Sequence, residues 1–164
     1  MEYKNLFSFN VKWNYKTISM FLFLLVLPNL LGVINLPTMF GFKIHFFQIA
    51  VFIAALLYGP MGGMMSGLIG SFYSALIMSN PYILVGNAIL GLFVGLFFRY
   101  GLNVVISVLL AYLVQLPWLI VTDYYFVGLS VVFIRGLVIA LFVSNMIWAV
   151  VAHYSLKPIR KSLE

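Results

Sequence analysis

The hydrophobic residues of this chain form long continuous runs instead of an alternating pattern. A transmembrane α-helix needs about 20 consecutive apolar residues, whereas the strands of a membrane β-barrel show alternating segments of about ten residues. Continuous runs therefore predict helices. Six are expected, at residues 17–34, 44–58, 61–78, 81–98, 102–121 and 131–154.

Turn-forming residues separate these runs. Gly59-Pro60 ends the second run, because proline lacks the backbone N–H that a continuing helix needs. Asn80-Pro81 separates the third run from the fourth in the same way. The connecting loops are predicted at 35–43, 79–81, 99–101 and 122–130.

The composition indicates that the chain lies in a lipid bilayer and not in water. Only 7% of the 164 residues are charged and 65% are hydrophobic, whereas soluble domains contain about 25% charged residues. The sequence therefore predicts an all-α integral membrane protein. It would be a single six-helix transmembrane domain over 1–164, with an interfacial lead at 1–16 and a basic tail at 155–164.

The basic residues flank the hydrophobic runs, which is not the pattern of a nucleic-acid-binding patch. With six spans, seven basic residues fall on one side of the membrane and two on the other. This asymmetry predicts that both termini lie in the cytoplasm, and the plasma membrane is the expected location. The larger set is Lys4, Lys12, Lys16, Arg99, Lys157, Arg160 and Lys161, and the smaller set is Lys43 and Arg135.

Several kinds of chemistry are excluded by what the sequence lacks. There is no cysteine, and Asp123 is the only acidic residue away from the ends, so thiolate metal sites and paired-carboxylate catalysis are excluded. His45 has no second ligand at metal-binding spacing. A G-x-x-x-x-G-K-[ST] phosphate loop is absent, so the chain itself cannot hydrolyse ATP. We expect no enzyme activity and no cofactor, and a binding subunit that depends on partners.

Small residues recur at four-residue spacing on two of the predicted helices. This spacing lets helix backbones approach closely in lipid. The surface could serve an internal packing seam or a partner, and its width on the third helix favours the internal seam. The residues are Gly62, Ser66 and Gly70 with Gly63 and Gly67 beside them, and Gly91 and Gly95 on the fourth helix.

Arg135 is the sharpest anomaly, because it lies near the start of an apolar run. An arginine at the centre of a membrane helix costs about 2.5–3.5 kcal/mol on insertion scales. Two explanations remain open at this stage. Arg135 could pair with Asp123 across the short loop, or it could contact an anionic group of a ligand.

Polar and aromatic residues on the fifth helix share one face. Gln115, Trp118 and Thr122 lie at i, i+3 and i+7, which fits a small-molecule pocket that is apolar with a few polar groups. The alternative is a membrane-interface aromatic beside an interhelical hydrogen bond. Further candidates for the pocket are Asn87, Asn145, Tyr124 and Tyr125.

The segment 48–98 resembles the substrate-binding S components of energy-coupling factor (ECF) transporters. It reads QIAVFIAALLYGPMGGMMSGLIGSFYSALIMSNPYILVGNAILGLFVGLFF. The matching features are an apolar second helix ending in GP, a Gly-rich third helix, and an N/P-containing loop before a helix with GLFVG. The segment VFIRGLVIALFVSNMIWAVVAHYSLKPIRK is similar to the last helix of that family with its basic tail.

The resemblance implies a protein that binds a small water-soluble micronutrient, a vitamin or a precursor, on its outer side. It also implies partners in the bilayer, namely a transmembrane coupling subunit and two ATPase subunits. In that family the substrate lies among the outer ends of helices 4 to 6, under the loop after helix 1. The residues that fall there are Asn80, Asn87, Gln115, Trp118, Arg135 and Lys43.

The chain departs from the family at its first helix. Members often carry A-x-x-x-A there, but no alanine occurs between Thr17 and Asn35, and the nearest such pair is Ala50 and Ala54. The alternative is a membrane scaffold of cell-wall synthesis similar to MreD. The acidic residue expected on the third helix of MreD is missing from 67–75, which ranks transport first.

Overall fold

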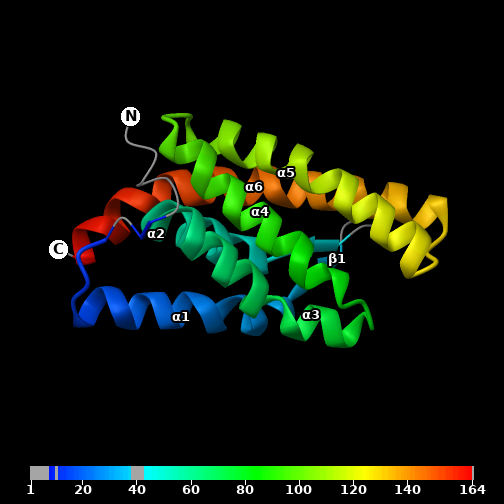
Figure 1. Ribbon diagram of the computed structural model, residues 1–164, viewed down its shortest axis with the longest axis horizontal. Coiled ribbons are helices and arrows are strands. Elements are labelled where there is room, and N and C mark those ends of the chain that lie inside the picture. The colour runs from blue at the N-terminus through cyan, green and yellow to red at the C-terminus, as the bar shows by residue number, and fades with distance from the viewer. Residues whose placement is uncertain (1–7, 10, 38–42, 164) are drawn as a thin grey trace.

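The computed structural model describes residues 8–9, 11–37 and 43–163. Apart from one short strand pair, the elements described are helical (Figure 1). In chain order the elements are α1 (Tyr15–Gly32), β1 (Asn35–Pro37), β2 (Lys43–His45), α2 (Phe47–Gly70), α3 (Phe72–Ile77), α4 (Tyr82–Arg99), α5 (Val104–Val121), the π-helical turn η2 (Thr122–Phe126) and α6 (Val131–Leu163).

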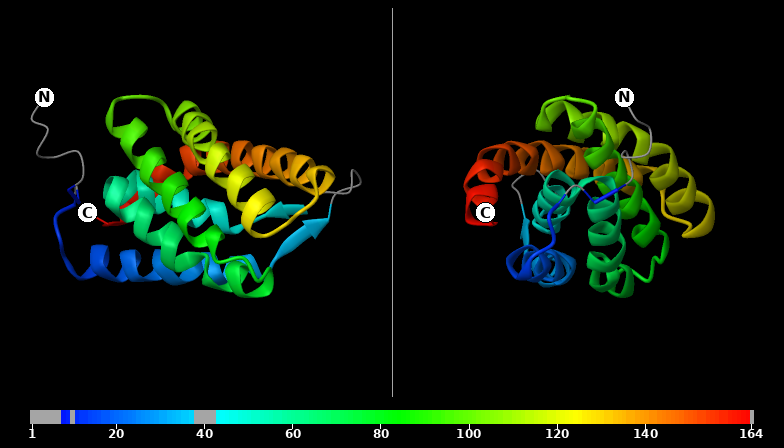
Figure 2. Two further views of the ribbon diagram at one scale, coloured as in Figure 1. Left: turned by 45° about the vertical axis from the view of Figure 1, so that its right-hand side comes forward. Right: turned by 60° about the vertical axis from the view of Figure 1, so that its left-hand side comes forward.

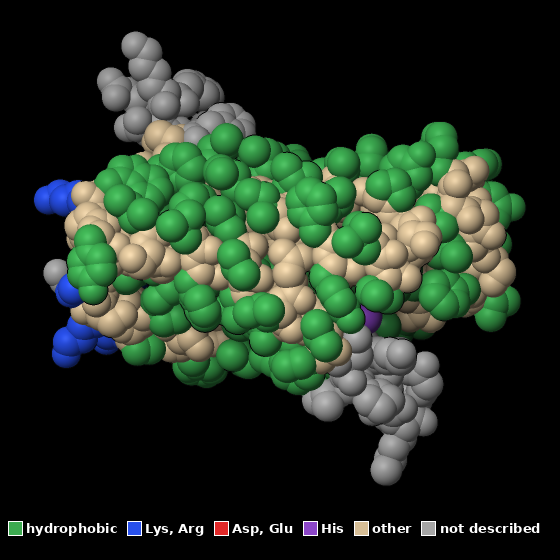
Figure 3. Space-filling model, turned by 90° about the horizontal axis from the view of Figure 1, so that it is seen from below, with side chains coloured by type: hydrophobic (Ala, Val, Ile, Leu, Met, Phe, Trp, Pro, Cys, Tyr) green, Lys and Arg blue, Asp and Glu red, His purple; other side chains and the backbone are tan. Residues whose placement is uncertain are grey.

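Five helical stretches are long and apolar enough to cross a membrane. They cover 15–32, 47–77, 82–99, 104–126 and 131–163. Apolar side chains also cover much of the surface that Figure 3 displays, as lipid contact requires. The chain therefore has the architecture of an all-helical multi-pass membrane protein, with five such stretches where the sequence predicted six.

The difference in number arises in α2, which contains the predicted break at Gly59-Pro60. Gly59 has a φ of +79° and is not helical. A β-carbon added to Gly63 would lie 2.6 Å from the Cβ of Ala55, although residues eight apart in a straight helix are separated by about 12 Å. The halves of α2 on either side of Gly59 therefore fold back against each other.

The first half of α2 is short for a membrane span. Residues 47–58 are helical and rise only about 18 Å, compared with roughly 30 Å for the hydrocarbon core of a bilayer. Side chains in this part of α2 are largely buried inside the protein. The sixth span therefore stays a prediction.

Helix α2 is the centre of the bundle. It packs against α1, α4 and α6, while α5 packs on α4 and α6 at the side away from α1 (Figure 2). One buried cluster fills the space between α2, α4, α5 and α6, and includes Phe52, Val94, Val108 and Tyr112. A second cluster around Phe21 and Tyr58 joins α1 to α2.

The closest helix contact lies between α2 and α4 and is formed by glycines. A β-carbon on Gly63 would collide with the carbonyl of Gly91, and one on Gly67 would collide with the carbonyl of Asn87. A β-carbon on Gly95 would lie 2.6 Å from the backbone nitrogen of Pro60. These residues therefore form an internal seam in which only glycine permits the backbone approach.

The same small-residue surface of α2 also packs against α1. The Ser66 hydroxyl donates a hydrogen bond of 2.7 Å to the carbonyl of Leu24, and a β-carbon on Gly70 would lie 2.5 Å from the ring of Pro28. Gly62 lies next to the turn at Gly59, where its β-carbon would meet the carbonyl of Ala54 at 3.0 Å.

The first helix begins two residues earlier than its hydrophobic run because of a capping box. The side chain of Asn14 accepts a hydrogen bond of 2.9 Å from the backbone N–H of Thr17. The hydroxyl of Thr17 accepts one of 2.8 Å from the backbone N–H of Asn14. This exchange satisfies two N–H groups that a helix start otherwise leaves unpaired. Tyr58 donates to the carbonyl of Thr17 at 2.7 Å and ties the start of α1 to the turn in α2.

The start of α1 and the end of α6 lie at one end of the bundle (Figure 1). The ammonium group of Lys16 lies 3.5 Å from the carbonyl of Ser162, and the guanidinium of Arg160 donates to the carbonyl of Leu56 at 3.2 Å. On the face that Figure 3 draws, all the visible basic side chains lie at this end. We call it the basic end, and its described members are Lys12, Lys16, Arg99, Lys157, Arg160 and Lys161.

Other predicted boundaries also differ from the structure. The 35–43 loop carries an antiparallel strand pair, in which Asn35 pairs with His45, so α2 starts at Phe47 and not at residue 44. Helix α6 continues beyond residue 154 to Leu163, because hydropathy marks the part of a helix inside lipid and not its full length. Basic residues in its last turn suit the negative end of the helix dipole.

Candidate functional site

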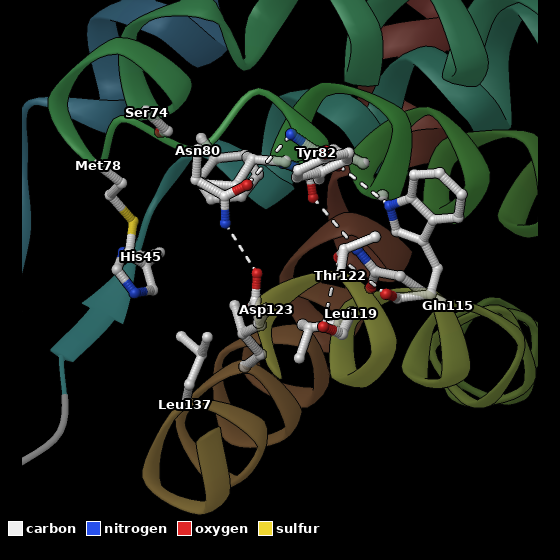
Figure 4. A pocket seen from close by; sticks show the side chains of 16 residues that line it. His45, Ser74, Met78, Asn80, Tyr82, Gln115, Leu119, Thr122, Asp123 and Leu137 are labelled. Atoms are coloured by element: carbon white, nitrogen blue, oxygen red, sulfur yellow. Dashed lines mark hydrogen bonds between the residues drawn. The ribbon is translucent and has the colours of Figure 1, made fainter. Parts of the chain in front are cut away.

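A cavity of about 80 Å³ lies among α2, α4, α5 and α6 at the end of the bundle opposite the basic end. Its lining is mostly apolar with polar groups from several elements, which is the usual composition of a small-molecule site. Figure 4 shows the lining side chains. They are His45, Phe47, Ser74, Met78, Asn80, Tyr82, Ile83, Gly86, Asn87, Gln115, Trp118, Leu119, Thr122, Asp123, Leu137 and Leu141.

A chain of buried amide and hydroxyl groups forms one wall of the cavity. The amide nitrogen of Gln115 donates to Oδ1 of Asn87 at 3.3 Å. The amide nitrogen of Asn87 donates to the hydroxyl of Ser71 at 2.8 Å. Ser71 in turn donates to the carbonyl of Gly67 at 2.6 Å. The network fixes α5, α4 and α2 relative to one another and orients both amides.

Ser71 also explains why the predicted third helix is interrupted. Its hydroxyl bonds to the carbonyl four residues earlier, a bond that competes with regular helix geometry. The backbone angles at Ser71, φ −101° and ψ 3°, lie outside the helical region. The helix therefore divides into α2 and α3 where the amide network begins.

Aromatic side chains form the next part of the lining. The indole N–H of Trp118 donates to the carbonyl of Tyr82 at 3.1 Å, and the two rings meet edge to face with centroids 6.4 Å apart. Gly86 lies beneath them, because a β-carbon there would be 3.3 Å from Cδ1 of Trp118 and 3.5 Å from Nε2 of Gln115. The absence of a side chain at Gly86 therefore leaves room beside Trp118.

The lining also contains an acidic side chain, that of Asp123. The π-helical turn η2 follows α5 directly, and it buries Thr122 and Asp123 while its other side chains are exposed. Oδ1 of Asp123 accepts a hydrogen bond of 2.7 Å from the amide of Asn80. Asn80 also accepts from the backbone N–H of Tyr82 at 3.1 Å. Such π turns occur often at functional sites.

The structure brings together half of the predicted binding residues. Asn80, Asn87, Gln115 and Trp118 line the cavity and come from α4, α5 and the loop before α4. The common face predicted for Gln115, Trp118 and Thr122 is the face that α5 presents to the cavity. The helical spacing therefore located this wall of the site.

The other predicted residues lie elsewhere. Tyr124 is 44% exposed and Asn145 is buried, but neither lines the cavity. Arg135 is exposed and does not line the cavity either. Within the described residues, no ion pair joins Arg135 to Asp123, whose side-chain partner is Asn80. The side chain of Lys43 lies outside the described part of the structure.

Several lining residues were missed as site residues, and two of them, Asp123 and Gly86, had a signal in the sequence. Asp123 is eight residues after Gln115 and therefore extends the same helical face, but its charge directed attention to Arg135. Gly86 precedes Asn87 on a helix already marked by small residues. His45 reaches the cavity through β2, and no feature of the local sequence predicts that strand pair.

The polar side chains of the lining are mainly amides and hydroxyls, beside one histidine and one aspartate. Among the described residues, no group of three or more His, Asp or Glu could hold a metal ion. The cavity is also smaller than the roughly 300–1,000 Å³ of sites for drug-sized ligands, so it fits a small molecule or one part of a larger one. Comparison with protein-family models, curated proteins and solved structures gave no match.

The position of Arg135 leads to a first prediction. We expect Arg135→Ala to leave the melting temperature of the detergent-solubilised protein nearly unchanged, because exposed substitutions usually change stability by less than about 0.5 kcal/mol. Thermal unfolding of both proteins, monitored by tryptophan fluorescence, tests this. A large loss of stability would show that Arg135 has a structural partner.

Proposed function

We propose that the chain is the membrane-embedded substrate-binding subunit of an ECF-type transporter for a small micronutrient. The observation that carries the proposal is the cavity that contains Asn80, Asn87, Gln115 and Trp118. It lies at the end of the bundle away from the basic residues, which the positive-inside rule assigns to the cytoplasm. A site there is accessible from outside and can capture a nutrient.

The course of the chain supports the six-helix, S-component-like bundle. If the halves of α2 on either side of Gly59 are counted separately, the helices give the six passes that the proposal requires. An even number places both termini at one end, as the contact between Lys16 and Ser162 requires. The S-component resemblance of residues 48–98 covers this hairpin and α4.

Dependence on partners follows from the absence of a nucleotide-binding motif in the sequence. Uptake against a gradient needs an energy source, so a coupling subunit and two ATPase subunits would supply it. Affinity purification of the tagged chain from its own membranes tests this. An ATPase pair with a larger membrane subunit supports transport, whereas MreC-like or peptidoglycan-synthesis proteins would favour the scaffold.

Membrane orientation is a second prediction. Because the chain has no cysteine, single-cysteine variants at Lys12, Lys43 and Lys161 can be labelled without background. We expect Lys12→Cys and Lys161→Cys to react only after the cell is opened, and Lys43→Cys to react with an impermeant maleimide from outside. Labelling of all three from one side would contradict the six-pass orientation.

A further inference from the structure

The cavity contains the one acidic residue that lies between Glu2 and Glu164. Asp123 is only 5% exposed and lines the cavity. One of its oxygens accepts a hydrogen bond of 2.7 Å from Asn80. Among the described residues, Asn80 is the side chain that the structure records in a hydrogen bond to this carboxylate. Figure 4 shows Asp123 between Asn80 and Leu137.

Among the residues that the structure describes, no ion pair to Asp123 is recorded. No lysine or arginine is among the lining residues that the structure describes. Lys12, Arg99, Arg160 and Lys161 line hollows at the basic end. The exposed Arg135 makes no ion pair with Asp123 within the described residues.

A buried carboxylate without a positive partner is costly, because the low-dielectric interior replaces the water that would stabilise its charge. A cation that enters the cavity would offset that cost. It would also find suitable neighbours, since aromatic faces attract cations and the rings of Trp118 and Tyr82 belong to the lining. The amide of Gln115 and that of Asn87 add polar contacts.

We propose that the cavity binds a small organic cation, with its positively charged nitrogen against Asp123 and its ring or apolar part against Trp118 and Tyr82. This assignment rests on the proposed function, because it names the substrate class of the same site. It replaces the anionic ligand that Arg135 indicated in the sequence. The cavity volume of about 80 Å³ limits the enclosed part to a small group or a single ring.

Three compounds of one size test the charge preference. Benzylammonium, benzyl alcohol and benzoate share one ring and carry a positive, a neutral and a negative group. We would titrate each into the purified protein in detergent by calorimetry at pH 8. Benzylammonium should bind about tenfold or more tightly than benzyl alcohol, as expected for a hydrogen bond to a charged group, and benzoate should bind most weakly.

Two variants test whether Asp123 causes the preference for the cation. Asp123→Asn removes the charge but keeps an oxygen that can accept from Asn80, and we expect it to bind benzylammonium and benzyl alcohol within about twofold of each other. Arg135→Ala is the matched control, because it changes a charge outside the cavity and should preserve the wild-type preference. If Asp123→Asn does not fold, the wild-type series still decides the sign of the preferred charge.

Each contrary result overturns the cation assignment. These results are equal or tighter binding of benzyl alcohol or benzoate, no binding of any of the three compounds, and a preference that survives in Asp123→Asn. A protonated Asp123 would give equal or tighter binding of benzyl alcohol or benzoate, because it leaves no negative charge to favour a cation. Recovery of an ATPase pair together with any of these results would leave the transport proposal standing. A charge preference together with recovery of cell-wall proteins would refute transport and retain the site.

Discussion

Replacing Gly91 with alanine should lower the melting temperature of the purified protein by several degrees. A β-carbon at Gly91 would collide with the carbonyl of Gly63 and lie 3.1 Å from its Cα. Because these atoms are backbone, relief requires α2 and α4 to separate along the tightest contact in the bundle. Overpacking of this kind costs about 1–3 kcal/mol. Thermal unfolding in detergent, with size-exclusion chromatography, measures the effect.

Gly136→Ala is the matched control for this substitution. Gly136 is also helical, but a β-carbon there meets nothing within 4 Å. Alanine has a higher helix propensity than glycine by about 1 kcal/mol, so this variant should be as stable as the wild type or slightly more stable. Equal destabilisation by both substitutions would show that the glycine seam between α2 and α4 does not hold the bundle together.

The hydrophobic pattern predicted most of the helices because lipid imposes a simple rule on them. Every backbone polar group in the hydrocarbon core must be paired, so continuous apolar runs become helices. The Gly59-Pro60 signal also located the break in α2. The local sequence does not predict that the chain reverses direction at this break. The reversal at Gly59 depends on contacts between the two halves of α2, such as that of Gly63 with Ala55.

The candidate site was predictable to the extent that it lies on regular helices. Gln115 and Trp118 share a helical face, and that face lines the cavity. Arg135 was placed with them because residue type alone indicated a ligand contact, whereas its position on the exposed side of α6 depends on how α6 packs. Asp123 lies in the π-helical turn that directly follows α5, and its charge suggested a pairing with Arg135 instead of a place in the cavity.

The two ends of the bundle have different chemistry, and this difference supports a capture function. The basic end presents cationic side chains where α1 starts and α6 ends. The opposite end buries amides, an indole and one carboxylate around a cavity. Buried polar groups are expensive to keep inside a membrane protein and often mark substrate pathways. The amide network is consistent with the proposed binding site, and it links α2, α4 and α5.

Replacing Gly86 with leucine should abolish small-molecule binding while preserving the fold. The new side chain would start 3.3 Å from Trp118 and 3.5 Å from Gln115 and would extend into the space that these residues line. A cavity of about 80 Å³ cannot hold both a leucine side chain and a ligand. Leucine also favours the helical state over glycine by up to about 1 kcal/mol, so α4 should remain intact.

The measurement compares the small molecules that stay bound to the wild type and to Gly86→Leu during purification. Small molecules released by denaturing each protein are quantified by mass spectrometry, and thermal shifts are recorded with a panel of vitamins and their precursors. We expect Gly86→Leu to lose at least about 90% of the occupancy, which corresponds to a tenfold or greater loss of affinity. Gly136→Leu introduces the same side chain on α6, where a β-carbon meets nothing within 4 Å, and it should retain the wild-type molecules. Equal retention by Gly86→Leu would mean that these molecules bind outside the cavity lined by Trp118 and Gln115.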